Sequence, residues 1–128
     1  MLDTAFLIDA ERSKEEMAGT IGDDDDVAIA AITAAELLAG VHLATGRQKA
    51  ARQRFADQVT RSIPIIPYDL PVATAHAVLL AAVRRAGRPR GAHDLIIAAT
   101  AVASQRIVVT ADPAAFADLG GVSCRSYR

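Results

Sequence analysis

The chain has 128 residues, of which 52% are hydrophobic and 4% aromatic, and its net charge is −1. This length fits one compact domain over residues 1–128, which can be stable without a disulfide. The single cysteine, Cys124, excludes an internal disulfide and a cysteine-based zinc site. There is no signal-like start and no apolar run of about 18 residues, which predicts a cytoplasmic protein.

The charge is unevenly distributed along the chain, although it nearly cancels overall. Residues 1–46 hold ten acidic and two basic residues, whereas residues 47–90 hold nine basic and two acidic residues. An acidic region can hold a metal ion, and a basic region beside it can hold a polyanion. The distribution therefore favours a metal-dependent nuclease.

In chain order, the pattern predicts short apolar strands that alternate with helices. Strands are expected at residues 1–3, 27–32, 63–67, 106–110 and 122–124. Helices are expected at residues 4–10, 13–22, 33–44, 48–61, 71–86, 93–104 and 113–119. Such alternation predicts βαβ units and an α/β fold, a three-layer α/β/α sandwich with a central, mainly parallel sheet. The helix over residues 93–104 is apolar nearly all round and should be buried.

Several residues are typical of helix ends. Thr33 and Glu36 have the spacing of a capping box at the start of the helix over residues 33–44, and Gly46 is predicted to end it. Gly87 is predicted to end the helix over residues 71–86.

Four acidic residues lie where a predicted strand and a helix meet: Asp3, Glu36, Asp94 and Asp112. Ligands bind beyond the C-terminal ends of parallel strands, so all four can reach the same edge of the sheet. Carboxylates gathered there repel one another unless a cation lies among them, and desolvating an unpaired one is costly. Hard oxygen ligands suit Mg²⁺ or Mn²⁺. The four acids therefore predict a metal-dependent enzyme that acts on phosphate.

Each of these acids except one also has a structural interpretation. Asp112 precedes Pro113, a common N-cap arrangement, and Glu36 could be the capping partner of Thr33. Asp94 lies near a helix start, where the helix dipole favours a carboxylate. Asp3 has no evident capping partner, so Asp3 and Asp94 make the strongest case for metal contact.

The segments around these acids resemble the PIN domain. They read Asp-Thr-Ala-Phe-Leu-Ile-Asp from Asp3, Thr-Ala-Ala-Glu-Leu-Leu-Ala-Gly around Glu36, His-Asp-Leu-Ile-Ile-Ala-Ala-Thr-Ala around Asp94 and Thr-Ala-Asp-Pro-Ala-Ala-Phe around Asp112. The resemblance covers residues 1 to about 125, and the short single-domain form is similar to VapC-type toxins of bacterial toxin–antitoxin pairs. Ala5 departs from the family, where a small polar residue is frequent at that position.

The resemblance implies Mg²⁺- or Mn²⁺-dependent RNA cleavage that inhibits translation and growth. It also implies inhibition by a cognate VapB-type antitoxin and formation of a homodimer, with a heterotetramer or larger assembly when the antitoxin is bound. It assigns the metal-binding and catalytic roles to Asp3, Glu36, Asp94 and Asp112. Thr4 and Thr110 receive supporting roles.

Basic residues just ahead of Asp94 are predicted to bind RNA. They are Arg84, Arg85, Arg88 and Arg90. Arg84 and Arg85 also suit a helix C-terminus, where the dipole favours cations. The low aromatic content predicts recognition through RNA shape and phosphates rather than base stacking. A metal-activated water would attack phosphorus in line and leave a 5′-phosphate and a 3′-hydroxyl.

Other interpretations of the acidic pocket stay open. A receiver-like phospho-acceptor module also has an acidic Mg²⁺ pocket, but it needs a late lysine, and Lys14 and Lys49 both lie early. A non-catalytic protein or a DNA-directed nuclease could have the same pocket. Asp9 could join the acidic rim or pair with an arginine.

Overall fold

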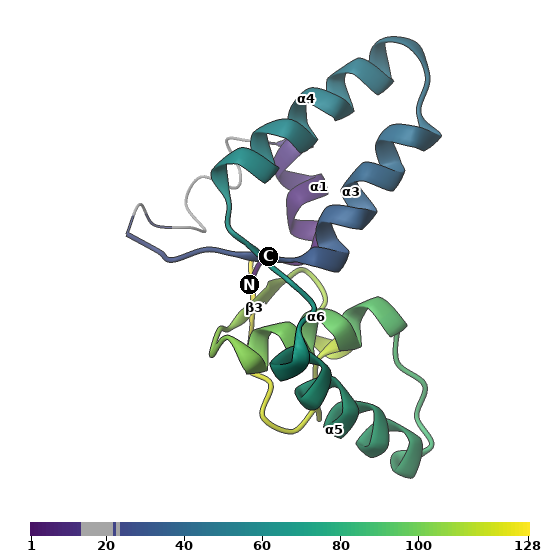
Figure 1. Cartoon of the computed structure of the whole chain (residues 1–128), viewed down its shortest axis with the longest axis vertical. Helices are drawn as coiled ribbons and strands as arrows, with labels where there is room; N and C mark the ends of the chain where they lie inside the picture. The colour runs from purple at the N-terminus through teal and green to yellow at the C-terminus, as the bar shows by residue number, and fades with distance from the viewer. Residues whose placement is uncertain (14–21, 23) are drawn as a thin grey trace.

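The computed structural model of the protein describes residues 1–13, 22 and 24–128. The helix predicted over residues 13–22 therefore lies almost entirely outside the described residues. Figure 1 shows helices on both sides of a small central sheet. Helices α1 (Thr4–Arg12), α3 (Ala31–Leu43) and α4 (Gly46–Ser62) lie on one side, and α5 (Leu70–Ala86) and α6 (Ala92–Ala103) lie on the other.

The strands of the sheet are all parallel. Strand β1 (Ile29–Ala30) pairs with β2 (Ile65–Ile66), and β3 (Val108–Thr110) pairs with β4 (Cys124–Ser126). Leu2 lies between these pairs: it forms a parallel bridge with Val109, and its N–H donates to the Ala28 carbonyl at 3.0 Å. The first residues of the chain thus occupy the middle of the sheet. The predicted α/β/α fold with a parallel central sheet is confirmed.

Neighbouring residues on the central strands face opposite layers, as the two-residue period of a strand requires. On one face, packed against α5 and α6, lie Met1, Ala30 and Val108. On the other face, packed against α1, α3 and α4, lie Leu2, Ile29 and Val109. Both faces are therefore covered by helices, and the strand ends are the part of the sheet left for a ligand.

Helix α6 is the most deeply buried helix in the described part of the chain. Its buried residues are Leu95, Ile97, Ala98, Ala99, Thr100 and Ala101. The small alanine side chains let α6 lie close to its neighbours, and its packing partners include Val72 and Leu79 of α5. The prediction that this helix is buried is confirmed for its central residues, and its exposed first turn lies at the sheet edge.

The capping box predicted at Thr33 and Glu36 is wrong. Helix α3 begins at Ala31, directly after β1, so both residues lie inside the helix rather than at its entrance. Thr33 is fully buried, and its Oγ1 has no hydrogen-bond partner among the described residues. The strand passes into the helix without a connecting turn, so the motif lies too far along the chain to cap it.

Two glycines flank the helices in different ways. Gly87 ends α5 in the left-handed conformation, with φ +64°, as predicted. Gly46 does not end α3, which stops at Leu43; it begins α4 instead, with φ +58°. Glycine suits both positions because it lacks the Cβ that makes positive φ costly.

The other helix boundaries lie within a few residues of the prediction. The last predicted helix is shorter than expected, a 3₁₀ turn named η1 (Pro113–Ala115). Among the described residues, no helix is both long enough and apolar enough to span a membrane.

Candidate active site

Asp3 caps helix α1. Its Oδ1 accepts a hydrogen bond from the Phe6 N–H at 2.9 Å, and the residue is only 6% exposed. Asp3 therefore acts as an N-cap, a role that was not evident from the sequence. Burial raises the pKa of the carboxyl group, while hydrogen bonds from the Thr110 hydroxyl and the Phe6 N–H partly offset this rise. A carboxylate can accept further bonds, so a cap can also bind a cation.

Glu36 connects two other parts of the fold. Its Oε1 accepts a hydrogen bond from the Thr4 hydroxyl at 2.8 Å, and its Oε2 lies 3.4 Å from Nδ1 of His93. Thr4 begins α1 and His93 lies in the first turn of α6. Since α3 carries Glu36 past the helix entrance, these contacts replace the predicted capping interaction.

Asp94 lies in the first turn of α6, and the charges of the other three acids affect its pKa. Its pKa is raised first by burial and then by the charges of Asp3, Glu36 and Asp112. Together with the contacts of Glu36 with Thr4 and His93, these charge effects indicate that the four acids lie near one edge of the sheet. Gly91 packs closely here, because a Cβ added at Gly91 would lie 2.9 Å from Oδ2 of Asp94.

Asp112 follows β3 and is held through its backbone. Its N–H donates to the Thr110 hydroxyl at 3.0 Å, whereas its side chain makes no capping hydrogen bond to η1 within the described residues. The capping interpretation of Asp112 is therefore wrong. The Thr110 hydroxyl thus hydrogen-bonds both to the Asp3 carboxyl group and to the Asp112 N–H.

The donor set fits a hard divalent cation, although the side chains do not form a ligand cage as they stand. Among the described residues, no three Asp, Glu, His or Cys side chains are placed so that they could hold a metal ion directly. Burial and like charge nevertheless raise the pKa of both Asp3 and Asp94, so a nearby cation would relieve the repulsion. Oxygen donors of this kind suit Mg²⁺ or Mn²⁺.

The arginines ahead of Asp94 fall into two groups. Arg84, Arg85 and Arg88 are exposed and available to a ligand. Arg90 instead donates to the carbonyl oxygens of Ala114, Ala115 and Ala117. The structure therefore gives Arg90 an intramolecular role that the sequence did not suggest.

Asp9 pairs with an arginine, one of the two roles considered for it. Its Oδ2 accepts hydrogen bonds from the Tyr127 hydroxyl at 2.6 Å and from Nη2 of Arg128. These contacts lower the pKa of Asp9, mainly through Tyr127, whose own pKa is raised by burial and by the bond to Asp9. The Tyr127 ring also packs edge-on against Phe6 at 5.0 Å. The C-terminal residues Tyr127 and Arg128 therefore contact α1 through Asp9 and Phe6, and the part played by Tyr127 was not predicted from the sequence.

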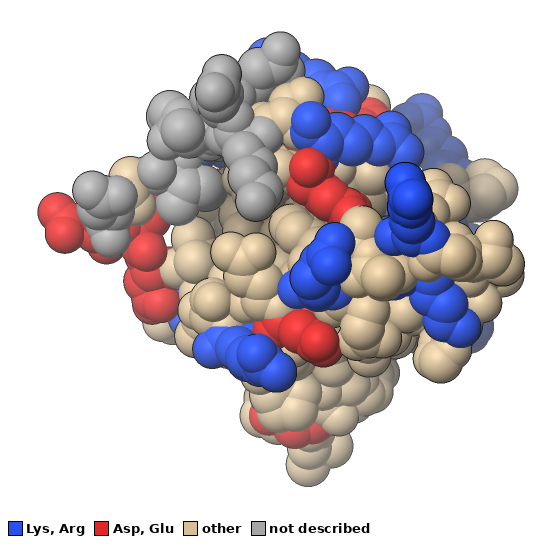
Figure 2. Space-filling model, turned by 90° about the horizontal axis from the view of Figure 1, so that it is seen from above, with Lys and Arg blue, Asp and Glu red and all other residues tan. Residues whose placement is uncertain are grey.

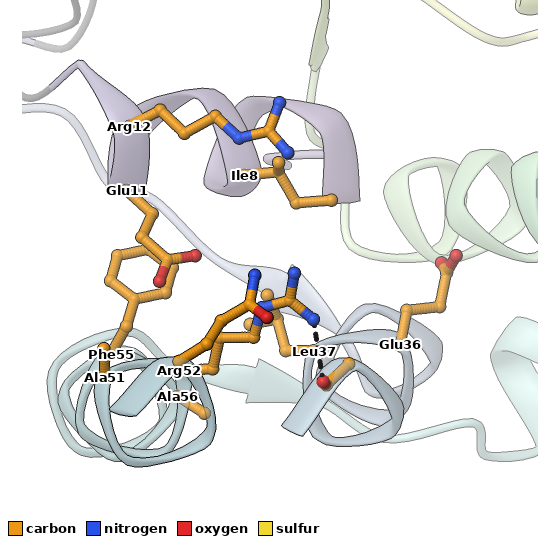
Figure 3. A pocket seen from close by; sticks show the side chains of 11 residues that line it. Ile8, Glu11, Arg12, Glu36, Leu37, Ala51, Arg52, Phe55 and Ala56 are labelled. Carbon is orange, nitrogen blue, oxygen red and sulfur yellow. Dashed lines mark hydrogen bonds between the residues drawn. The ribbon is translucent and has the colours of Figure 1, made fainter. Parts of the chain in front are cut away.

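A groove of about 380 Å³ begins beside Glu36 and runs between α1, α3 and α4 (Figure 3). Apolar side chains of Ile8, Leu37 and Phe55 line it, together with charged groups of Glu11 and Arg12. Arg52 crosses between helices there, because its Nη1 donates to the Gly40 carbonyl at 3.0 Å. Figure 2 shows basic side chains spread over the face above α3 and α4, with acidic side chains between them.

Solved structures share this fold over nearly the whole chain. DNA-bound VapBC from Salmonella typhimurium matches with a TM-score of 0.90 and 23% identity, covering 100% of this chain and 97% of the other. VapBC-5 from Mycobacterium tuberculosis, a member of the VapBC family of toxin–antitoxin systems, matches with a TM-score of 0.75 and 27% identity, covering 98% and 95%. FitAcB from Neisseria gonorrhoeae matches with a TM-score of 0.77 and 27% identity, covering 98% and 96%.

The sequence matches a family model but no individual curated protein. The family model described as the PIN domain matches residues 1–122. This match spans all four acids of the site and agrees with the parallel sheet and its helical layers. The resemblance to the PIN domain is confirmed, and the chain belongs to the PIN domain family.

Proposed function

We propose that this protein is a Mg²⁺-dependent endoribonuclease, the VapC-type toxin of a toxin–antitoxin pair. Membership of the PIN family and the likeness to chains of VapBC complexes support a toxin of this type. The observation that carries the proposal is the position of Glu36, whose two carboxylate oxygens contact Thr4 beside Asp3 and His93 beside Asp94. Cleavage of RNA would inhibit translation and growth.

The described side chains have different roles in the proposed reaction. Asp3 and Asp94 would bind the cation most directly, with Glu36 and Asp112 completing the acidic edge. A bound Mg²⁺ would polarise the scissile phosphate and lower the pKa of an attacking water. Thr4 and His93 orient the Glu36 carboxylate through their contacts with its two oxygens.

Substrate binding would depend on the arginines that have no intramolecular carbonyl contacts. Arg84 and Arg85 lie in the last turn of α5, and Arg88 follows the end of that helix. All three are exposed, so they can approach phosphate groups without breaking contacts within the protein. Recognition of this kind depends on charge and therefore weakens with added salt.

The groove beside Glu36 would receive a segment of the cognate VapB-type antitoxin. The matched solved structures include DNA-bound VapBC and a member of the VapBC family of toxin–antitoxin systems, which supports such a partner. The apolar floor and charged rim of the groove suit an amphipathic segment. We propose further that the protein forms a homodimer, and a heterotetramer or larger assembly with the antitoxin, as its resemblance to VapC-type toxins implies.

The proposal is tested by RNA cleavage with Mg²⁺, with Mn²⁺ and with a chelator. The parent should cleave only with a metal ion and leave 5′-phosphate ends. Asp3→Asn and Asp94→Asn should each lose about 100-fold or more in rate, because an amide is a poor substitute for a carboxylate at a metal. Asp3→Asn keeps an oxygen that can cap α1, which separates the metal role from the cap.

Asp24→Asn is the matched control, because Asp24 is exposed and lies outside the site. Full activity of both Asp3→Asn and Asp94→Asn would contradict the site assignment. A 2′,3′-cyclic phosphate product would overturn the mechanism. Cleavage of DNA alone would favour the DNA-directed alternative, and absence of cleavage would favour a non-catalytic one. Membership of the PIN family already favours a nuclease over a receiver-like module.

A further inference from the structure

Arg90 bridges two segments that are far apart in sequence. Its Nη1 donates to the Ala114 carbonyl at 2.8 Å and to the Ala115 carbonyl at 3.4 Å, and its Nη2 donates to the Ala117 carbonyl at 2.7 Å. These carbonyls belong to η1 and the residues just after it. The Ala114 carbonyl also accepts the Ala117 N–H at 3.4 Å. The guanidinium adds donors to carbonyl groups at the end of this short turn, where backbone donors run out.

Each end of this bridge lies close to one acid of the site. On one side, Arg90 adjoins Gly91, whose carbonyl accepts the Leu95 N–H at 3.1 Å and so starts the turn that holds Asp94. On the other side, the Ala115 N–H donates to the Asp112 carbonyl at 3.1 Å. Movement of η1 relative to the start of α6 would therefore change the separation of Asp94 and Asp112.

The chemistry of the contact requires arginine rather than a positive charge alone. A guanidinium is a planar fork with five donors, which can contact several carbonyls at once. A lysine ammonium is a compact charge on a flexible stem and cannot reproduce this geometry. Arg88 provides a comparison within the same loop, because it is exposed and makes no such carbonyl contacts with the described residues.

We propose that Arg90 is a positioning residue that holds Asp112 at the correct separation from Asp94 and thereby sets the affinity of the site for a divalent cation. The inference rests on the proposed function, because it assumes that these carboxylates share the ion. It distinguishes Arg90 from the other three arginines: Arg90 organises the acidic edge, whereas the exposed Arg84, Arg85 and Arg88 would bind RNA under the proposed function.

The experiment compares Arg90→Lys and Arg90→Ala with Arg88→Lys and Arg88→Ala in the full-length protein. Mn²⁺ binding is measured without RNA, from the electron paramagnetic resonance signal of the free ion. Both Arg90 variants should bind Mn²⁺ about 10- to 100-fold more weakly, the usual effect of losing a group that orients a metal ligand. Both Arg88 variants should bind Mn²⁺ as the parent does.

Cleavage kinetics provide a second readout, because they separate the Mg²⁺ requirement from KM for RNA. A general loss of structure would change both quantities together. The Mg²⁺ concentration for half-maximal rate should rise in the Arg90 variants, with little change in KM for RNA at saturating Mg²⁺. Arg88→Ala should show the reverse, a higher KM for RNA and an unchanged Mg²⁺ requirement. Thermal unfolding of each variant shows whether it is folded, and Arg90→Lys is sufficient for the test if Arg90→Ala does not fold.

The outcomes separate this inference from the proposed function. Unchanged Mn²⁺ affinity in Arg90→Lys would overturn the positioning role and leave the nuclease proposal intact. A parent that binds Mn²⁺ but does not cleave RNA would contradict the proposed function, while the Mn²⁺ affinities still decide the role of Arg90. A parent that binds no Mn²⁺ would overturn both.

Discussion

Asp94 holds its proton more tightly than an isolated aspartate, because burial and three neighbouring acids raise its pKa. In the unfolded chain the pKa returns to about the ordinary value of 3.8. The folded protein therefore binds the proton more strongly, and its stability falls as pH rises from 3.8 through the raised pKa. The pKa of Asp3 is raised as well, so Asp3 also lowers the stability of the folded protein as pH rises.

We expect Asp94→Asn to be more stable than the parent at neutral pH in the presence of a chelator. The amide removes one ionised carboxylate from the acidic edge, and the difference should shrink at acidic pH, where the carboxyl group is protonated. Denaturant unfolding over a range of pH measures the effect, with Asp24→Asn as control. Mg²⁺ should stabilise the parent more than Asp94→Asn, because a ligand stabilises only the state that binds it. Equal stability of the two proteins at neutral pH would contradict the raised pKa.

Gly91 controls the position of the same carboxylate by its lack of a side chain. Its backbone angles, φ −58° and ψ 129°, are accessible to alanine, so strain comes only from the 2.9 Å approach of the new Cβ to Oδ2 of Asp94. We expect Gly91→Ala to fold and to lose about 10-fold or more in cleavage rate, because displaced catalytic groups are costly. Gly120→Ala is the control, since no atom lies within 4 Å of its added Cβ. Equal rates in the two variants would show that the Asp94 side chain moves freely.

Sequence reasoning misassigns the local roles of three of the four acids. Asp3 appeared to have no capping partner, yet it caps α1. Glu36 and Asp112 had the spacing of caps, yet their side chains cap no helix among the described residues. A cap depends on where the first helical turn begins, and a shift of two residues is enough to remove it. The carbonyl contacts of Arg90 depend on tertiary structure and have no sequence pattern at all.

Helices α4 and α5 start in contrasting ways. The Asp69 carboxylate accepts a hydrogen bond from the Val72 N–H at 3.2 Å at the start of α5. Thr45 occupies the same position before α4 but makes no side-chain capping bond to a described residue. We expect Asp69→Ala to lower the free energy of unfolding by about 1 kcal/mol, and Thr45→Ala to change it by less than about half of that. Urea unfolding measures both, and equal losses would contradict the capping role of Asp69.

Element types were predictable where packing and local signals agree. Helix α6 is apolar on nearly every side, and α5 has proline in its first turn and Gly87 at its end. Helix α3 differs because residues 27–32 are uniformly apolar, and such a run does not show where a strand ends and a helix begins. The sequence therefore predicts the first two residues of α3, Ala31 and Ile32, as the end of a strand.

Leu2 joins the two halves of the sheet and is 3% exposed, whereas Leu70 is 78% exposed. Truncation of Leu2 leaves a cavity between β1 and β3, so Leu2→Ala should cost about 2–5 kcal/mol of stability. Leu70→Ala should change the stability by less than about 0.5 kcal/mol. Chemical denaturation of both variants provides the measurement. A cost below about 1 kcal/mol for Leu2→Ala would mean that the middle of the sheet is not a single packed core.

The layered architecture followed from the alternation of strands and helices, but the strand order did not. The sequence predicts a strand at residues 1–3 without showing that Leu2 pairs with Val109 and hydrogen-bonds to Ala28. Pairing across more than a hundred residues is decided by the packing of the helices, which short-range patterns do not contain. The same packing brings Asp3 and Asp94 to one edge.

The central position of residues 1–3 also affects the order of events during translation. Leu2 leaves the ribosome long before Val109, its partner in the sheet, has been synthesised. The Asp3 N–H donates to the Val109 carbonyl at 3.3 Å, so this hydrogen bond also forms only after Val109 has been synthesised. Until then Asp3 lacks the strand that places it, and Asp112 has not been made. A nascent chain is therefore without its acidic edge until nearly the whole domain has emerged.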